Sequence, residues 1–86
     1  MNICFLIGEV VSKIDFRFIL NAENKEKVSK SVFNVKLRNG SILKVYGYDE
    51  ISDYCYRKLN ENNTILIQGE LKKKGIELEN IEIMQL

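Results

Sequence analysis

Residues 32–48 constrain the fold more than any other stretch, because their turn decides which side chains share a face. Two alternating segments flank residues 38–40. A two-residue Asn-Gly turn, the commonest short hairpin signal, would mix apolar and charged side chains on one face. A three-residue loop ending at Gly40 instead pairs Val35 with Leu43, and the glycine takes the left-handed position. The sequence therefore predicts a β-hairpin with the three-residue loop.

The predicted register separates the hairpin into an apolar face and a polar, aromatic face. The apolar face should point into a core and consists of Phe33, Val35, Leu37, Leu43 and Val45. The other face consists of Val32, Asn34, Lys36, Ile42, Lys44, Tyr46 and Tyr48, with Arg38 at the tip. Aromatic rings stack on bases while cations contact phosphates, so this face is a candidate site for single-stranded nucleic acid. The structural alternative is that tyrosine and lysine are ordinary residents of a solvated strand face.

Composition places the chain among small globular proteins and limits its functions. Its 86 residues suffice for a single domain, residues 1–86. The formal net charge of +1 creates no global field toward nucleic acid or membranes, so any electrostatic attraction must be local. The longest apolar run, residues 3–7, is too short to span a bilayer, and no basic leader precedes it. We therefore expect a cytoplasmic protein without a signal peptide or membrane association.

Residue types that support catalysis or metal binding are scarce. The chain has no histidine, and its two cysteines, Cys4 and Cys55, lack CxxC spacing. A zinc site would therefore lack ligands, and a nucleophilic cysteine would lack a histidine base. The sequence predicts a protein that is not an enzyme and carries neither metal nor cofactor. Both cysteines are expected to be small buried residues.

The remaining segments predict further strands and a single helix. The strands are residues 2–11, 64–71 and 76–86, residues 14–20 alternate again after the first of them, and the helix is residues 49–59. Gly8 and Gly69 mark bends, and a slip in the alternation of the last strand predicts a bulge near Glu79-Asn80. Asp49 is the expected N-cap of the helix, whose apolar residues recur at helical spacing.

The order of these elements predicts an all-β fold with one short helix. We count three strands, the helix and two more strands (β-β-β-α-β-β). A five-stranded sheet in so short a chain must curl to bury its faces, and the helix is placed to plug one end of the barrel. This is the order of the oligonucleotide/oligosaccharide-binding (OB) fold.

Short motifs across nearly the whole chain resemble the bacterial single-stranded DNA-binding proteins. The motifs are Leu6-Ile7-Gly8, Asp15-Phe16-Arg17-Phe18, Phe33-Asn34-Val35-Lys36-Leu37, Val45-Tyr46-Gly47 and Ile67-Gln68-Gly69-Glu70-Leu71. They occur in the family's order and at compatible spacing. The resemblance implies an OB fold that binds single strands by stacking and usually forms oligomers. It also places Tyr46 at the position of a stacking aromatic, whereas Tyr48 rests on the face argument alone.

The chain also departs from the family pattern. It has no tryptophan, and Lys13-Ile14 replaces the family's aspartate-proline dipeptide. It therefore resembles a minimal or divergent member, similar to the primosomal OB proteins. We expect a single-stranded DNA-binding protein of replication, repair or mobile-element maintenance, with RNA open as a ligand. The alternative is a protein-interaction OB module that does not bind nucleic acid.

The expected nucleic-acid contacts come from the polar hairpin face and from the lysine turn at residues 72–75. They are Tyr46, Tyr48, Lys44, Lys36, Arg38, Asn34, Lys72, Lys73 and Lys74. The lysine turn could equally serve solubility alone. Arg17 could contact phosphate, but it is expected instead to pair with an acidic neighbour such as Asp15 or Glu9. The acidic residues of the last strand would repel phosphates and exclude that strand from the path; they are Glu77, Glu79 and Glu82.

For two apolar segments the sequence permits more than one location, in the core or on the surface. For Ile3, Cys4 and Phe5 the choice lies between barrel core and a subunit interface, because the first strand is apolar on both faces. We expect a homodimer formed through that strand. Phe16 and Phe18 share an apolar strand face and are expected to lie in the core, the alternative being that they stack on bases.

Overall fold

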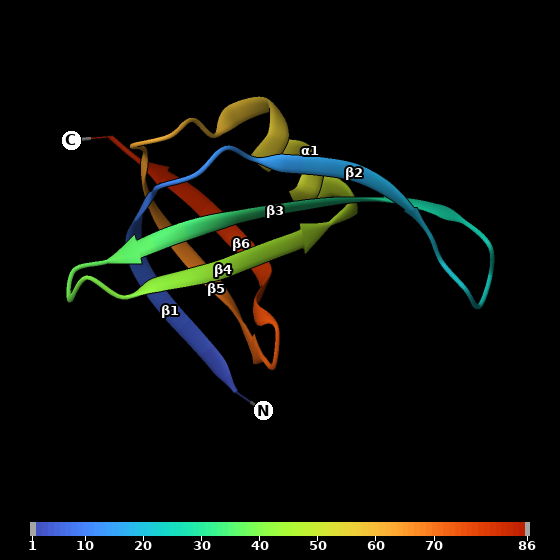
Figure 1. Ribbon diagram of the computed structural model, residues 1–86, viewed down its shortest axis with the longest axis horizontal. Coiled ribbons are helices and arrows are strands. Elements are labelled where there is room, and N and C mark those ends of the chain that lie inside the picture. The colour runs from blue at the N-terminus through green and yellow to red at the C-terminus, as the bar shows by residue number, and fades with distance from the viewer. Residues whose placement is uncertain (1, 86) are drawn as a thin grey trace.

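The computed structural model describes residues 2–85, in which six strands accompany one helix (Figure 1). The strands are β1 (Ile3–Val10), β2 (Asp15–Leu20), β3 (Lys27–Leu37), β4 (Ile42–Tyr48), β5 (Thr64–Lys72) and β6 (Gly75–Met84), and the helix is α1 (Asp49–Lys58). Each predicted segment is present with nearly the expected bounds. Leu86, the predicted end of the last strand, lies outside the described residues.

The helix follows the fourth strand of the chain, so the predicted count of three strands before it is wrong. Both β1 and β2 pair with β3, β2 with residues 27–32 and β1 with residues 35–37. The two strands therefore occupy successive parts of one position beside β3. The extra strand arises from a break at residues 11–14, and the barrel itself still has five strands.

The barrel closes through β1, which pairs with β5 on one edge and with β3 on the other. Around the barrel the order is β1, β5, β6, β4 and β3, and β4 runs parallel to β6 with Tyr46 opposite Glu77. A side chain at Gly8 would overlap Cγ1 of Val35, so glycine permits the close approach of β1 to β3. The predicted all-β OB architecture is confirmed.

The β3–β4 hairpin has the predicted register. Val35 lies opposite Leu43, and Phe33 lies opposite Val45. The amide of Leu37 donates to the carbonyl oxygen of Ser41 (N···O 2.8 Å) and closes the three-residue loop. Gly40 has a φ of 90°, which a residue without a side chain adopts at little cost. The alternation of side chains and one glycine were therefore sufficient to determine this register.

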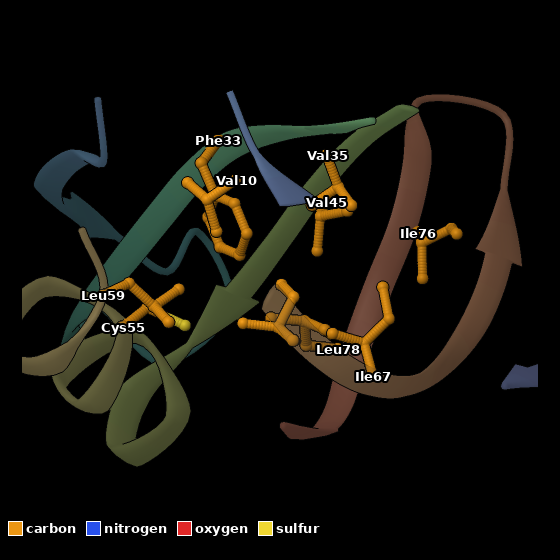
Figure 2. Packing of buried hydrophobic residues seen from close by; sticks show 10 residues of the cluster. Val10, Phe33, Val35, Val45, Cys55, Leu59, Ile67, Ile76 and Leu78 are labelled. Atoms are coloured by element: carbon orange, nitrogen blue, oxygen red, sulfur yellow. The ribbon is translucent and has the colours of Figure 1, made fainter. Parts of the chain in front are cut away.

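The inward face of the hairpin forms one wall of the hydrophobic core (Figure 2). The buried cluster consists of Val10, Phe33, Val35, Val45, Cys55, Leu59, Ile65, Ile67, Ile76 and Leu78. Burial of each large apolar side chain contributes roughly 1.5–3 kcal/mol. Cys55 enters this cluster from α1, and its burial raises the pKa of the thiol to about 12. Cys4 is only half-buried, so the prediction of two buried cysteines is confirmed for Cys55 alone.

Buried hydroxyl groups hold α1 on β3. The Ser31 hydroxyl donates to the carbonyl oxygen of Ser52 at 2.8 Å and lies 2.9 Å from the Ser52 hydroxyl. The Ser29 hydroxyl donates to Oδ1 of Asp53 at 2.9 Å. The N-cap is Tyr48, so the predicted cap at Asp49 is wrong. Because β4 continues directly into α1, Asp49 is already the first helical residue and no side chain caps the helix.

The hairpin of β2 and β3 reaches beyond the barrel and α1 (Figure 1). Phe16 is half-buried against Tyr56 of α1, with ring centroids 4.4 Å apart. Phe18, further along β2, is 61% exposed. Neither ring belongs to the core cluster, so the predicted core positions of Phe16 and Phe18 are both wrong, because β2 pairs with the part of β3 that lies beyond the barrel.

The irregularity predicted in the last strand is present. Gln68 pairs with Asn80, whereas the next residue, Gly69, pairs with Leu78, which leaves Glu79 as the extra residue of a bulge. No helix among residues 2–85 is long and apolar enough to cross a membrane.

Candidate functional site

The outward side chains of β3 and β4 form a continuous surface, here called the tyrosine face. Its members are Lys30, Val32, Asn34, Lys36, Ile42, Lys44, Tyr46 and Tyr48. In the ladder Lys30 lies opposite Tyr48, Val32 opposite Tyr46 and Asn34 opposite Lys44. The polar and aromatic side chains predicted to share a face therefore do so.

A pocket of about 270 Å³ lies on the tyrosine face and is called here the tyrosine pocket. Its lining consists of Lys30, Val32, Lys44, Tyr46, Tyr48 and Lys74. Lys74 comes from the turn between β5 and β6, where the adjacent Gly75 lies against the carbonyl group of Lys44 so closely that a side chain would overlap it. The closed barrel thus brings three lysines from distant parts of the chain around two tyrosines.

The two tyrosine rings pack edge to face beneath one lysine. Their centroids are 5.9 Å apart and their planes are inclined by 82°. The ammonium nitrogen of Lys30 lies 5.2 Å from the centroid of Tyr46 and 5.5 Å from that of Tyr48, within the range of cation–π attraction. Tyr46 is only 7% exposed, and Tyr48 is half-buried. The two rings form an aromatic site, but in this conformation the ammonium group of Lys30 lies over them.

The electrostatic environment of the pocket is mixed. Burial, followed by the nearby Glu77 carboxylate, raises the pKa of the Tyr46 phenol, which therefore stays protonated and neutral at neutral pH. Glu77 lies opposite Tyr46 where β4 meets β6. An anionic ligand in the pocket would therefore meet cations on the β3 and β4 side and a carboxylate on the β6 side. The sequence led us to expect that β6 repels phosphates.

The other predicted contact residues lie outside the tyrosine pocket. Lys36 and Arg38 line a separate hollow together with Glu9 and Thr64 of the neighbouring strands. Asn34 is half-buried between the two hollows. The structure thus arranges these three predicted residues along the hairpin, away from the ring pair.

The three lysines of the lysine turn also differ in their positions relative to the tyrosine pocket. Lys72 pairs with Glu70 at 3.4 Å, and Lys73 is exposed at the turn. Only Lys74 reaches the tyrosine pocket. Of the nine predicted contacts, the pocket therefore unites Tyr46, Tyr48, Lys44 and Lys74.

Lys30 was missed by the sequence prediction although it contacts both rings. Continuing the alternation of β3 backward from Val32 places Lys30 on the same face, so the signal was available. Arg17 lies opposite Lys30 on β2 and forms the predicted ion pair with Asp15, at 2.8 Å. This pairing confirms the structural interpretation of Arg17.

The outward face of β1 is a second unusual surface. Ile3, Phe5 and Ile7 are all exposed, Phe5 by 67%. Cys4 and Leu6 point the other way and pack against the core. The alternatives left open by the sequence therefore divide by residue: Cys4 belongs to the barrel, whereas Ile3 and Phe5 are free to meet a partner.

No group of three or more His, Cys, Asp or Glu side chains within residues 2–85 is arranged to hold a metal.

Known structures share this fold. The SSB domain of a Synechococcus protein is 20% identical, with a TM-score of 0.72 and coverage of 95% of this chain and 94% of that one. For the small single-stranded DNA-binding protein of Streptomyces coelicolor the identity is 13%, the TM-score 0.68 and the coverage 95% and 91%. The wild-type single-stranded DNA binding protein of Thermus aquaticus is 18% identical, with a TM-score of 0.75 over 100% of this chain and 41% of that one.

No family model and no curated protein sequence matches the chain. At the identities of the structural neighbours, the likeness establishes a common fold. The resemblance to bacterial single-stranded DNA-binding proteins is therefore confirmed at the level of the OB barrel.

Proposed function

We propose that this protein binds single-stranded DNA on the tyrosine face, without catalysis, in replication, repair or mobile-element maintenance. The observation that carries the proposal is the tyrosine pocket, in which two aromatic rings and three lysines meet on one outward sheet surface. The names of the structural neighbours support DNA as the ligand. Nucleic acids satisfy this surface because every base has a stacking face and every nucleotide carries a phosphate.

The proposed path runs along the β3–β4 hairpin. A base stacks on Tyr48, the less buried of the two rings, while Lys44 and Lys74 contact the flanking phosphates. Lys36 and Arg38 extend the positive surface toward the hairpin tip. Stacking contributes about 1–3 kcal/mol per base and depends little on base identity, so we expect binding that tolerates most sequences.

The affinity should depend strongly on salt. The net charge of +1 provides little long-range attraction, and Glu77 lies beside the pocket. Each lysine–phosphate contact contributes about −0.7 to the slope of log affinity against log salt for a single strand. We therefore expect moderate affinity at low salt that falls steeply as the salt concentration rises.

The decisive experiment is a fluorescence-anisotropy titration of a labelled oligodeoxythymidine with three proteins. We expect Tyr48→Ala to weaken binding by roughly 5- to 150-fold, equivalent to about 1–3 kcal/mol. Phe18→Ala is the control, because Phe18 is likewise an aromatic ring near a lysine, Lys27 at 5.5 Å, but lies off the tyrosine face. Equal binding by Tyr48→Ala and the parent would show that this face is wrong.

The same titration tests the competing interpretations. An oligoribouridine of equal length shows whether the protein prefers DNA or RNA. If the parent binds no single strand even at low salt, the protein-interaction OB module replaces the nucleic-acid interpretation. The exposed apolar row on β1 would then be the first surface to test for a protein partner.

We also propose that the protein forms a homodimer through the outward face of β1. Ile3, Phe5 and Ile7 form an apolar row on one strand face, and contiguous exposed apolar side chains of this kind mark interaction sites. Phe5→Asp should convert a dimer to a monomer in sedimentation experiments. Leu20→Asp is the control, because Leu20 is equally exposed, at 66%, but lies on β2. A parent protein that sediments as a monomer at high micromolar concentration would contradict the proposal.

A further inference from the structure

We propose that Lys30 covers the two tyrosine rings in the free protein, and that its ammonium group moves from the rings to the phosphates when single-stranded DNA binds. Lys30 is then both a competitor of the base and a contact for the backbone. This inference rests on the proposed single-strand binding and assigns a role to a residue that the motif resemblance does not include.

The geometry shows that one ammonium group covers both rings. Its nitrogen lies 5.2 Å and 5.5 Å from the two centroids, and the rings are nearly perpendicular to each other. The position follows from the sheet, because Lys30 is opposite Tyr48 and one ladder step from the pair of Val32 and Tyr46. Tyr46 itself is only 7% exposed.

A base and the ammonium group compete for the same ring surface. Stacking requires the base to lie against the ring face, where the lysine headgroup now sits. Lys30 forms no ion pair with any residue of the described chain, so no carboxylate holds its headgroup in place. Its four-carbon stem is flexible, and a phosphate attached to the incoming base is a stronger partner than a neutral ring.

Lys44 provides the natural comparison. It lines the same pocket from β4, but its ammonium group is not above either ring. Removing Lys44 should therefore remove a phosphate contact alone. Removing Lys30 should remove a phosphate contact and also uncover the rings.

The two effects of Lys30 differ in their response to salt. The contribution of one phosphate contact to affinity falls about fivefold over a tenfold rise in salt, because counterion release accounts for it. The cover over the rings lies at a half-buried site and is screened much less. At low salt the removal of the phosphate contact should dominate, and at high salt the uncovering of the rings should dominate.

The test is an anisotropy titration of oligodeoxythymidine at about 0.05 M and about 0.5 M salt with the parent, Lys30→Ala and Lys44→Ala. Both variants should bind more weakly than the parent at low salt. At high salt Lys44→Ala should approach the parent from below, whereas Lys30→Ala should bind about two- to fivefold more tightly than the parent. Lys30→Gln replaces the alanine variant if the latter shows a lower thermal midpoint.

An abasic strand with the same number of phosphates tests whether the tighter binding expected of Lys30→Ala depends on base stacking at the rings. Without bases the rings are not used, so Lys30→Ala should bind more weakly than the parent at both salt concentrations, as Lys44→Ala does. Tighter binding of the abasic strand by Lys30→Ala would overturn the inference, and so would superimposable salt curves for the two variants on oligodeoxythymidine. A parent that binds neither strand at either concentration would instead refute the proposed function.

Discussion

The two faces of the β3–β4 hairpin each conceal an aromatic ring, but by different means. Phe33 on the inward face is 2% exposed, and Tyr46 on the outward face is 7% exposed. Phe33 is covered by the opposite strands and by α1, whereas the ammonium group of Lys30 lies over the ring of Tyr46. A ring packed inside a barrel is uncovered only by unfolding, while a ligand can displace a flexible side chain that lies over a ring.

The comparison shows why low exposure alone does not assign a ring to the core. The inward ring belongs to a cluster in which every neighbour is apolar. The outward ring has ammonium groups around it and a carboxylate beside it. The chemistry of the covering groups, rather than the exposed fraction, distinguishes a structural ring from one that can receive a ligand.

The largest effect should come from truncation of the inward ring. We expect Phe33→Ala to lower the free energy of unfolding by about 3–5 kcal/mol, because it leaves a cavity that the closed barrel cannot fill. Urea denaturation measures the change. Val32→Ala, one residue away on the outward face, should cost less than about 1.5 kcal/mol. Equal losses for the two variants would mean that the faces are not distinct.

The next largest effect should come from Tyr46, where two substitutions distinguish the role of the ring from that of its hydroxyl group. Tyr46→Ala should weaken oligonucleotide binding by about 1–3 kcal/mol, because it removes a stacking surface and the support for Tyr48. Tyr46→Phe keeps the ring and should bind within about threefold of the parent. Anisotropy titration measures both, with thermal unfolding as the check on folding. Binding by Tyr46→Ala as tight as that of the parent would show that this ring has no part in the site.

A smaller effect concerns the charges of the outward face. Replacing Lys36 and Lys44 together by glutamine should flatten the salt dependence by about 0.7 for each lysine–phosphate interaction that the substitutions remove. Both side chains are exposed, so the unfolding free energy should change little. Titrations at several salt concentrations give the slope. An unchanged slope would place the phosphates elsewhere on the protein.

The smallest effect should be found at the end of the tyrosine face. Ile42 is 61% exposed opposite Lys36, and Ile42→Thr should change both stability and binding by less than about 0.5 kcal/mol. The same denaturation and anisotropy measurements apply. A large loss of binding would show that the nucleic acid also packs against this apolar side chain beside Lys36.

The comparison of the two faces was largely predictable, because the period of a strand is local. Alternating side chains and Gly40 determined the hairpin register, and the slipped phase of the last strand located the bulge at Glu79. The same alternation assigned Tyr46 and Lys44 to one face. These features depend on neighbours in the chain or on a single strand pair, which is the range over which a two-residue period carries information.

The composition of the pocket depended on the closed barrel instead. Lys74 meets Lys44 only because β6 lies beside β4, and the low exposure of Tyr46 could not be read from the alternation of its strand. Phe18 was assigned to the core by its pattern, yet it is 61% exposed on β2. A strand pattern shows which side chains share a face. Only the tertiary structure decides what covers that face, because the covering groups come from distant segments that barrel closure brings together.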